Sequence, residues 1–333
     1  MILNMNLGKN SYDIVVQRGS LSRVGELLNV DRKVLVVTDS GVPEKYARLV
    51  ASQCTEAVVE TIPQGEGSKS FDMYARLLKV LLDNGFTRSD CVVAVGGGVV
   101  GDLSGFVAAS YMRGIDFYNI PTTVLSQIDS SIGGKVAIDF EGIKNIVGAF
   151  YQPKKVIIDP DVLSTLPDRQ ISNGLAEAVK MALTSDAELF ELFETKDIME
   201  NIDEIIIRSL NIKKNVVEQD EKEKGLRKIL NFGHTIGHGI ESTSPSGSLY
   251  HGECVALGML LMCSESIKGR IEAVLEKTGL PTSVDYDKDA VCEAVLHDKK
   301  FSGKKVTVIR VETPGEFVME DMSGEELIKI VKG

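Results

Sequence analysis

The chain has 333 residues, of which 43% are hydrophobic and 26% charged, and its formal net charge at pH 7 is −11. This composition is typical of a globular protein long enough for two domains. Nucleic acids and anionic membranes are bound through basic patches, so the acidic balance argues against both as partners. An anionic small molecule is not excluded, because a few lysines and arginines can form a local positive pocket.

Strands and helices alternate in the first half of the chain. The residue pattern predicts strands over 33–39, 57–63, 91–95 and 117–123, and helices over 42–53 and 69–86. The third strand, CVVAV, is apolar throughout, which is typical of a parallel sheet covered on both faces. The alternation predicts a doubly wound α/β domain with a mainly parallel sheet.

The pattern changes after KKVIIDP (154–160). The segments 174–183, 203–230 and 252–268 have helical periodicity, and a convincing strand returns only at 304–311. We therefore expect an α/β domain over residues 1–157 and a mostly helical domain over residues 158–333. A cleft between two unlike domains is where a site is expected.

Cysteine usage and the N-terminal residues indicate the compartment. The cysteines are odd in number, far apart and without a CxxC pair: Cys54, Cys91, Cys254, Cys263 and Cys292. This pattern is typical of reduced thiols in the cytosol. Lys9 and Asp13 interrupt the start of the chain, so it is no signal peptide, and the apolar runs are too short to span a membrane. We expect a cytoplasmic protein.

A glycine-rich loop, VGGGVVGD (95–102), follows the third strand and opens a predicted helix. Gly96, Gly98 and Gly101 satisfy GxGxxG, in which backbone N–H groups approach a pyrophosphate at a helix N-terminus. The motif alone is weak, because glycine at such a turn is as often structural. The usual acidic residue of the next strand end is missing, but Asp39 closes the first strand and can hold ribose hydroxyls. The loop predicts a dinucleotide bound in a variant arrangement.

Three of the four histidines of the chain are crowded together. His234 and His238 lie four residues apart in LNFGHTIGH (230–238), and His251 follows in LYHGE. Two histidines at this spacing on a helix can both bind zinc, or they can simply pack and form hydrogen bonds at a helix start. The histidines alone leave both interpretations open.

The segment DSSIGGKVAIDFEGIKNIVGAFYQP (129–153) resembles the signature of the 3-dehydroquinate synthase family, D-S-x-x-G-G-K, then G-K-N, then G-x-F-x-Q-P. Further matches follow in the family's order: GLAEAVK (174–180), EKGLRKILNFGHTIGH (223–238), HGE (251–253) and DKK (298–300). The resemblance thus covers essentially the whole chain. It departs at VAID (136–139), where TGVN is more frequent, and at GIKN (142–145), where LGKN is. The family's fold is a dinucleotide-binding α/β domain followed by an all-helical domain.

The resemblance implies a reaction and its cofactors. The family converts 3-deoxy-D-arabino-heptulosonate 7-phosphate to 3-dehydroquinate and phosphate, in the shikimate pathway of aromatic amino-acid biosynthesis. The steps are transient oxidation by NAD, phosphate elimination, re-reduction and intramolecular aldol closure, so the enzyme is a carbon–oxygen lyase. The implied cofactors are NAD and Zn²⁺ or Co²⁺, and the implied partners are a phosphorylated sugar-acid substrate and a second copy of the chain in a homodimer.

The resemblance also assigns site residues. The metal ligands would be Glu177, His234 and His251. The catalytic residues would be His238, Glu223 and Lys135. The substrate would be bound by Arg113, Asp129, Lys135, Asn145, Lys180, Lys213, Arg227, Asn231 and Lys300. The dinucleotide would be bound by Asp39, Glu66, Lys69, Gly97, Gly98, Val99, Asp102, Thr122, Thr123, Lys144 and the segment from Val162 to Thr165.

Ordinary roles and other activities stay open beside this assignment. A single lysine is commonly a solvated surface residue, Glu223 lies in the charged stretch EKEKG, and the threonines of PTT can cap a helix. Another sugar-phosphate cyclase, making an inosose or a valiolone, would share the metal and NAD sites, but the intact GGK, Arg227 and Asn231 favour the dehydroquinate reaction. A metal-dependent polyol dehydrogenase would release NADH and would not need so many cations. A catalytically silent scaffold would not retain every ligand.

Overall fold

The computed structural model describes residues 1–245, 247–297 and 305–333. The chain forms two compact units, Met1–Pro167 and Asp168–Gly333. Among the described residues, no helix combines the length and the apolar character needed to cross a membrane.

The first unit is built on a seven-stranded sheet in the order β1-β2-β9-β6-β5-β3-β4. Its strands are β1 (Ile2–Met5), β2 (Tyr12–Val16), β3 (Lys33–Asp39), β4 (Glu56–Ile62), β5 (Cys91–Gly96), β6 (Asp116–Pro121) and β9 (Lys155–Ile158). All neighbours pair in parallel except β1 and β2. The predicted mainly parallel sheet is therefore confirmed, and the predicted strands differ from the observed ones by only one or two residues at their ends.

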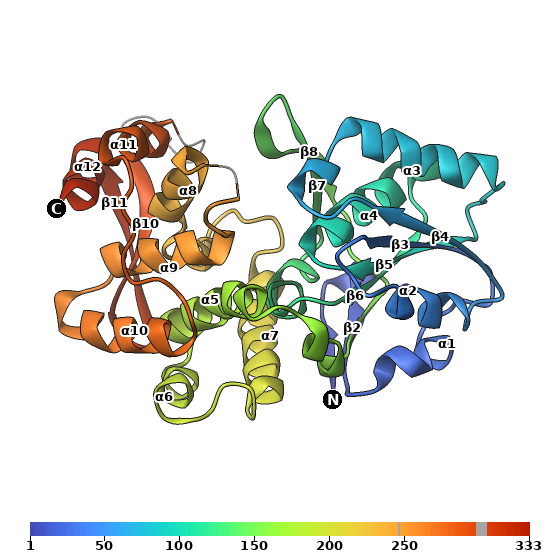
Figure 1. Ribbon diagram of the computed structural model, residues 1–333, viewed down its shortest axis with the longest axis horizontal. Helices are drawn as coiled ribbons and strands as arrows, with labels where there is room; N and C mark the ends of the chain where they lie inside the picture. The colour runs from blue at the N-terminus through green and yellow to red at the C-terminus, as the bar shows by residue number, and fades with distance from the viewer. Residues whose placement is uncertain (246, 298–304) are drawn as a thin grey trace. The chain divides into compact units, whose positions relative to one another are not determined.

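Helices cover both faces of this sheet because its central strands are apolar on both sides. Val34 and Val36 of β3 share one core with residues of α1 (Val24–Leu27) and α2 (Glu44–Ala51). Figure 1 shows both helices beside the sheet. Leu35 and Val37, which point to the opposite face, pack with α3 (Phe71–Asp83) and α4 (Gly98–Ser110). Alternate side chains of one strand thus reach two separate cores, as a doubly wound sheet requires.

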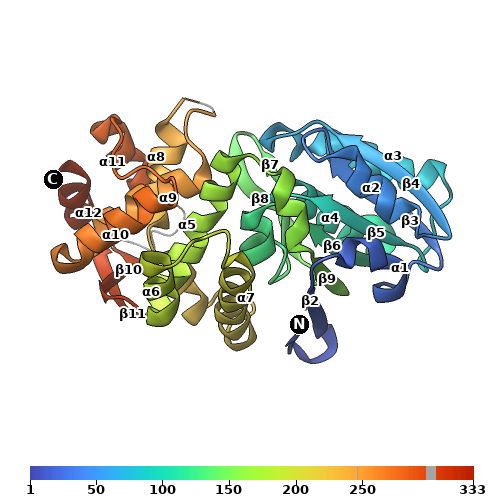
Figure 2. The same ribbon diagram turned by 60° about the horizontal axis from the view of Figure 1, so that its bottom comes forward.

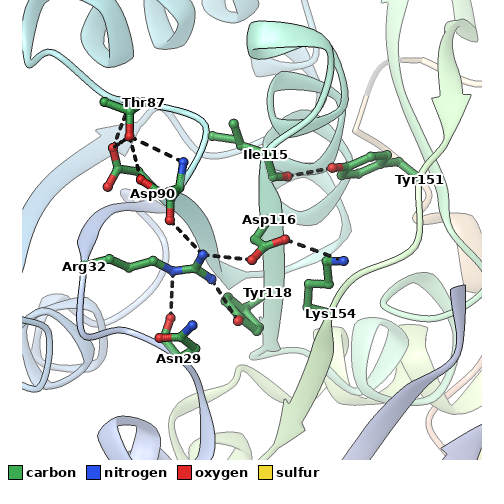
Figure 3. A network of polar contacts seen from close by, with 10 residues as sticks. Asn29, Arg32, Thr87, Asp90, Ile115, Asp116, Tyr118, Tyr151 and Lys154 are labelled. Carbon is green, nitrogen blue, oxygen red and sulfur yellow. Dashed lines mark hydrogen bonds and ion pairs between the residues drawn. The ribbon is translucent and has the colours of Figure 1, made fainter. Parts of the chain in front are cut away.

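An arginine joins the amino ends of three strands of the sheet (Figure 3). Arg32, just before β3, donates to the carbonyl oxygen of Ser89 before β5, at 2.9 Å, and to Oδ2 of Asp116 in β6, at 2.8 Å. It also donates to the hydroxyl of Tyr118 at 3.0 Å and to the carbonyl oxygen of Asn29 at 2.9 Å. Nothing in the sequence pattern predicts this network, because its members are far apart in the chain.

A hairpin and several short helical turns of the first unit lie outside the sheet, and some of them contain predicted site residues. A hairpin of β7 (Lys135–Phe140) and β8 (Ile143–Phe150) begins at the lysine of the GGK motif, contains the KN motif and was not predicted as strands. Short helical turns lie at η1 (Gly8–Asn10), η2 (Ser20–Arg23), η3 (Glu66–Ser68), η4 (Tyr111–Arg113), η5 (Ser126–Ser130) and η6 (Pro160–Thr165).

The first unit ends at Pro167, whereas the sequence predicts the boundary at residue 157. The difference arises because the η6 turn contacts the first unit. The carboxylate of Asp159 accepts hydrogen bonds from the backbone N–H groups of Gly19 and Leu21, at 3.0 and 2.9 Å. The hydroxyl groups of Tyr46 and Thr165 are 3.0 Å apart. These long-range contacts tie residues 158–167 to the first unit.

The second unit is mostly helical. Its helices are α5 (Asp168–Ser185), α6 (Ala187–Thr195), α7 (Ile202–Gln219), η7 (Leu226–Asn231), α8 (His234–Thr243), α9 (His251–Met262), α10 (Glu265–Lys277), α11 (Lys288–Leu296) and α12 (Gly324–Lys332). The expectation of an all-helical unit needs one correction, because β10 (Lys305–Thr313) pairs antiparallel with β11 (Glu316–Ser323). The strand predicted at 304–311 corresponds to β10. Its partner β11 was not predicted because it lacks the alternation of a half-buried strand: Val318 and Met319 are exposed, and Met322 is its one buried residue.

Helices α5, α8 and α9 pack closely at the centre of the second unit, and Figures 1 and 2 both show α8 beside α9. Two glycines of α9 permit this approach. A Cβ atom on Gly252 would lie 2.0 Å from the carbonyl oxygen of Asn173 in α5, and one on Gly258 would lie 2.0 Å from that of Gly233, just before α8. The three helices therefore meet where their predicted metal ligands lie.

Candidate functional site

The order of the strands places the glycine loop at a switch in connectivity. From β3 the chain moves to β4 on one side, and it then returns to β5 on the other side of β3. Ligands of doubly wound sheets bind beyond the carboxyl ends of the strands at such a switch. Asp39 ends β3, and Gly97 and Gly98 follow β5 at the start of α4. The topology thus brings together the two features that the sequence assigned to a dinucleotide.

Both features have the local structure that this role requires. A Cβ atom on Gly97 would lie 3.2 Å from a methyl group of Thr123, and one on Gly98 would lie 3.1 Å from Oγ of Ser130, so larger residues would crowd the turn. Burial raises the pKa of the Asp39 carboxyl group, although its Oδ1 accepts a 2.8 Å hydrogen bond from the N–H of Gly41. Asp39 therefore also shapes the turn after β3.

A buried lysine, itself assigned to the dinucleotide, contacts two other residues with that assignment and one residue assigned to the substrate. The side chain of Lys69 is 4% exposed, and its Nζ lies 2.9 Å from Oδ2 of Asp102 and 3.4 Å from Oε1 of Glu66. The same Nζ also contacts Oδ1 of Asn145 in β8. Burial alone would lower the pKa of this ammonium group, but Asp102 and Glu66 outweigh burial and raise it. Lys69 is thus a charged centre of the predicted site.

The remaining residues assigned to the dinucleotide have less specific surroundings. Thr123 caps the turn that follows it, because its Oγ1 accepts a 3.1 Å hydrogen bond from the N–H of Ser126. Thr122 is buried, and Val99 is half-buried in the first turn of α4. Thr165 and Val162 lie against the Tyr46 hydroxyl, and Lys144 is exposed on β8. For Thr123 the capping role that the sequence left open is therefore present.

Unusual backbone conformations gather at predicted site residues. Among the described residues, the non-glycine residues with positive φ are Met112, Arg113, Glu141, Asn145 and Glu223. Three of these five, Arg113, Asn145 and Glu223, were assigned to the substrate or to catalysis from the sequence. Such conformations are unfavourable and persist where the surrounding structure holds them, which is often at functional sites. The other residues of the first unit that the sequence assigned to the substrate are Asp129, in η5, and Lys135, at the start of β7.

The three predicted metal ligands meet in the second unit. Glu177 of α5 is fully buried, and its Oε1 lies 3.3 Å from Nε2 of His234 and 3.4 Å from Nε2 of His251. Within the described residues this oxygen accepts no hydrogen bond. A buried carboxylate oxygen without a hydrogen bond is costly, and a cation between it and the two ring nitrogens would satisfy all three. The residues present therefore fit a divalent metal.

In both His234 and His251, the ring nitrogen that faces away from Glu177 lies beside an oxygen acceptor, as is usual for histidines that bind metals. Nδ1 of His234 lies 3.0 Å from the carbonyl oxygen of Phe232, and Nδ1 of His251 lies 3.0 Å from Oε2 of Glu241. In the neutral imidazole, an acceptor at Nδ1 favours the proton there and leaves the lone pair of Nε2 facing Glu177. Glu241 is a residue that the sequence analysis missed, since no motif marks the last residue of HTIGHGIE.

His238 also lies in this cluster. One ring nitrogen each of His234, His238 and His251 lies within 4.8 Å of the others, and the ring centroids of His238 and His251 are 5.6 Å apart. His238 is thus near enough to the predicted ligands to exchange protons with a group bound there. The geometry by itself is also compatible with His238 as a ligand.

Charge around Glu177 favours its ionised form. Lys180, one turn along α5, contacts its Oε2 and is almost fully buried. Burial alone would raise the pKa of Glu177, but Lys180 and His234 outweigh it and hold that pKa well below the usual range. Burial and Lys180 lower the pKa of His234, which favours the neutral imidazole that binds metals. Against the effect of burial, Glu177 and Glu241 raise the pKa of His251 to about 9, so a metal that binds its Nε2 would displace a proton from that nitrogen.

The other predicted substrate residues of the second unit lie on α7 and η7. Lys213 and Arg227 are buried, and Nη1 of Arg227 donates a 2.6 Å hydrogen bond to the carbonyl oxygen of Glu221. Nδ2 of Asn231 donates to Oε1 of Glu223 at 3.1 Å, so these two predicted residues form a pair. Lys300 lies outside the described residues.

Comparison with known proteins identifies the family. The family models described as 3-dehydroquinate synthase N-terminal and 3-dehydroquinate synthase C-terminal match residues 59–173 and 174–301. A curated 3-dehydroquinate synthase of Streptococcus suis is 41% identical over 354 residues and covers 100% of both chains. One of Thermoanaerobacter pseudethanolicus is 41% identical over 353 residues and covers 99% of both. The chain belongs to the 3-dehydroquinate synthase family. The predicted family is confirmed.

Solved structures confirm the fold expected for the 3-dehydroquinate synthase family. A 2-epi-5-epi-valiolone synthase of Streptomyces hygroscopicus, solved with NAD⁺ and Zn²⁺ bound, is 27% identical, with a TM-score of 0.87 over 96% of this chain and 95% of that one. A 2-deoxy-scyllo-inosose synthase, solved with carbaglucose-6-phosphate, NAD⁺ and Co²⁺, has a TM-score of 0.90 over 99% of both chains. At 24% identity the latter likeness shows the fold alone.

Proposed function

We propose that this chain is a 3-dehydroquinate synthase, which converts 3-deoxy-D-arabino-heptulosonate 7-phosphate to 3-dehydroquinate and phosphate. The observation that carries the proposal is its full-length identity of 41% to curated proteins of that name. The glycine loop at the connectivity switch and the cluster of Glu177, His234 and His251 support it further.

NAD is the proposed dinucleotide, bound beyond the carboxyl ends of β3 and β5. The backbone N–H groups of Gly97 and Gly98 would face the pyrophosphate, and Asp39 would accept hydrogen bonds from ribose hydroxyls. Lys69, charged and held by Asp102, would orient the cofactor on the side of Asn145.

Zn²⁺ or Co²⁺ is the proposed metal, held by Glu177, His234 and His251. When bound there, the metal supplies a Lewis acid that polarises a substrate hydroxyl oxygen. His238 is proposed to move protons beside this set, since it lies within the histidine cluster. The pair of Glu223 and Asn231 is proposed to hold a substrate hydroxyl group and to pass a proton to or from it.

The cations are proposed to bind the phosphate and carboxylate of the substrate. Lys180, Lys213 and Arg227 are buried cations at positions that the family resemblance assigns to the substrate, and guanidinium and ammonium groups bind phosphate and carboxylate through charged hydrogen bonds. Arg113 and Lys135 of the first unit, with Asp129 and Asn145, and Lys300 complete the proposed set. We further propose that the enzyme works in the cytoplasm as a homodimer, as the family resemblance implies.

Product analysis tests this function. Purified protein is incubated with the heptulosonate phosphate, NAD⁺ and Zn²⁺, and the released phosphate and 3-dehydroquinate are measured while NADH is followed by absorbance. We expect equal amounts of the two products and no accumulation of NADH, because the hydride returns to the substrate. NADH formed once per turnover would indicate a polyol dehydrogenase. Turnover of glucose 6-phosphate, with none of the heptulosonate phosphate, would indicate an inosose-forming cyclase.

A further inference from the structure

The β7–β8 hairpin carries an irregularity at Asn145. The regular pairing of the two strands is interrupted between Ile138 and Phe140 of β7, opposite residues 144–146 of β8. Asn145 there has a φ of 54°, in the left-handed region. Asparagine tolerates this region better than most residues, but the conformation still needs support from neighbouring groups.

The support comes from Asp139, the residue of β7 at the irregularity. The N–H of Asn145 donates a 2.7 Å hydrogen bond to Oδ1 of Asp139. The backbone N–H of Asp139 itself donates to the carbonyl oxygen of Lys69, at 2.8 Å. Since Nζ of Lys69 contacts Oδ1 of Asn145, the three residues form a closed ring of contacts. The ring fixes both the backbone and the side-chain amide of Asn145.

The backbone and the side chain of Asp139 each form one hydrogen bond, and a substitution can remove the second while keeping the first. The bond from its backbone N–H holds β7 against the loop at Lys69, and any residue at position 139 except proline can form it. The bond to its side chain holds Asn145, and only a residue with a side-chain oxygen at the right reach can form it. The sequence has aspartate here, within VAID, where asparagine of TGVN is more frequent in the family. Both residues can accept this bond.

We infer that Asp139 is a positioning residue, which holds Asn145 in its left-handed conformation and so directs the Asn145 amide toward the substrate beside Lys69. The inference rests on the proposed function, because Asn145 is assigned to the substrate through it. Asp139 lies within the VAID segment of the family signature, but it is not among the predicted site residues.

The first test measures the contact itself and does not depend on activity. Hydrogen exchange of the Asn145 amide, followed by NMR in the full chain, should be about three- to ten-fold faster in Asp139→Ala, the equivalent of one hydrogen bond. Asp139→Asn should exchange like the wild type, since its amide oxygen accepts the same bond. Glu141→Gln is the matched control, because Glu141 lies on the same hairpin and is exposed. Wild-type exchange in Asp139→Ala, or equally fast exchange in Asp139→Asn, would overturn the inference.

The second test separates positioning from general damage. In Asp139→Ala the KM for the heptulosonate phosphate should rise about three- to ten-fold, with smaller changes in kcat and in the Kd for NAD⁺. Asp139→Asn should restore the KM, and Glu141→Gln should leave it unchanged. A wild-type KM in Asp139→Ala, or an equal loss of affinity for NAD⁺, would contradict a positioning role toward the substrate. Failure of the proposed function is recognised separately, because the wild type would then release no phosphate while the exchange measurement would still report on Asp139.

Discussion

Oε1 of Glu177 lies 3.3 Å from Nε2 of His234, in a fully buried setting where that oxygen accepts no hydrogen bond within the described residues. Two atoms with lone pairs so placed repel one another unless a proton or a cation lies between them. The outer nitrogen of His234 faces a carbonyl oxygen, which favours a proton there and leaves Nε2 without one. A cation is therefore the partner that this pair of residues favours.

The first prediction separates metal ligands from the proton-transfer histidine. Glu177→Gln and His251→Ala should lose the bound metal, because each removes one ligand of a buried three-residue set. His238→Ala should keep about one metal per chain and lose activity by roughly a hundred-fold or more, the range of general acid–base catalysis. Metal content is measured by mass spectrometry of the purified proteins. His297→Ala is the control, because His297 is exposed and outside the cluster. Loss of metal from His238→Ala would show that the assignment of ligands is wrong.

The second prediction concerns Glu241, which holds His251 from outside the ligand set. Removing its carboxylate in Glu241→Ala should weaken metal binding by roughly ten- to a hundred-fold, since the imidazole of His251 loses the group that orients it. Glu241→Gln should lose less, because its amide oxygen still accepts the Nδ1 proton. Affinity is measured by competition with a chromophoric chelator. A wild-type affinity in Glu241→Ala would mean that α9 alone orients His251.

The sequence predicts elements and residues whose signals are local, and it misses those that depend on contacts between distant segments. The strands β3 to β6 were predicted because their apolar runs are local signals. The histidines and Glu177 were found through motifs that lie within short segments. Glu241, Asp139 and Arg32 were missed because their partners are set by the packing of separate elements, which no local pattern records. The β7–β8 hairpin was missed because β8 is largely exposed and so lacks the apolar alternation of a buried strand.

The third prediction concerns anion binding by Arg227. Arg227→Ala should weaken the binding of a non-reactive phosphonate analogue of the substrate, in the presence of NAD⁺, by about 2–5 kcal/mol if the buried guanidinium pairs with the ligand. Arg227→Lys should recover only part of this, because an ammonium group cannot form the two parallel hydrogen bonds of a guanidinium. Binding is measured by calorimetry on protein shown to retain its metal. Unchanged affinity in both variants would remove Arg227 from the proposed substrate residues.

The fourth prediction separates stability from function within the first unit. Arg32 joins the amino ends of β3, β5 and β6, whereas the predicted dinucleotide site lies at the carboxyl ends of β3 and β5. Arg32→Ala leaves Asp116, whose side chain is 32% exposed, without its 2.8 Å partner, and removes charged hydrogen bonds to two backbone carbonyl oxygens.

We expect Arg32→Ala to lower the free energy of unfolding by about 2–4 kcal/mol, because hydrogen bonds to charged groups contribute more than neutral ones and several are lost together. The Kd for NAD⁺ should change little, since the contacts lie at the opposite ends of the strands. Urea unfolding and calorimetry measure the two quantities on the same samples. Arg48→Ala is the matched control: its ion pair with Glu44 is solvent-exposed on both sides and should contribute less than about 0.5 kcal/mol. Equal stability losses in the two variants would show that the Arg32 network does not hold the sheet together, and a large loss of NAD⁺ affinity in Arg32→Ala would show that the amino ends of the strands are coupled to the site.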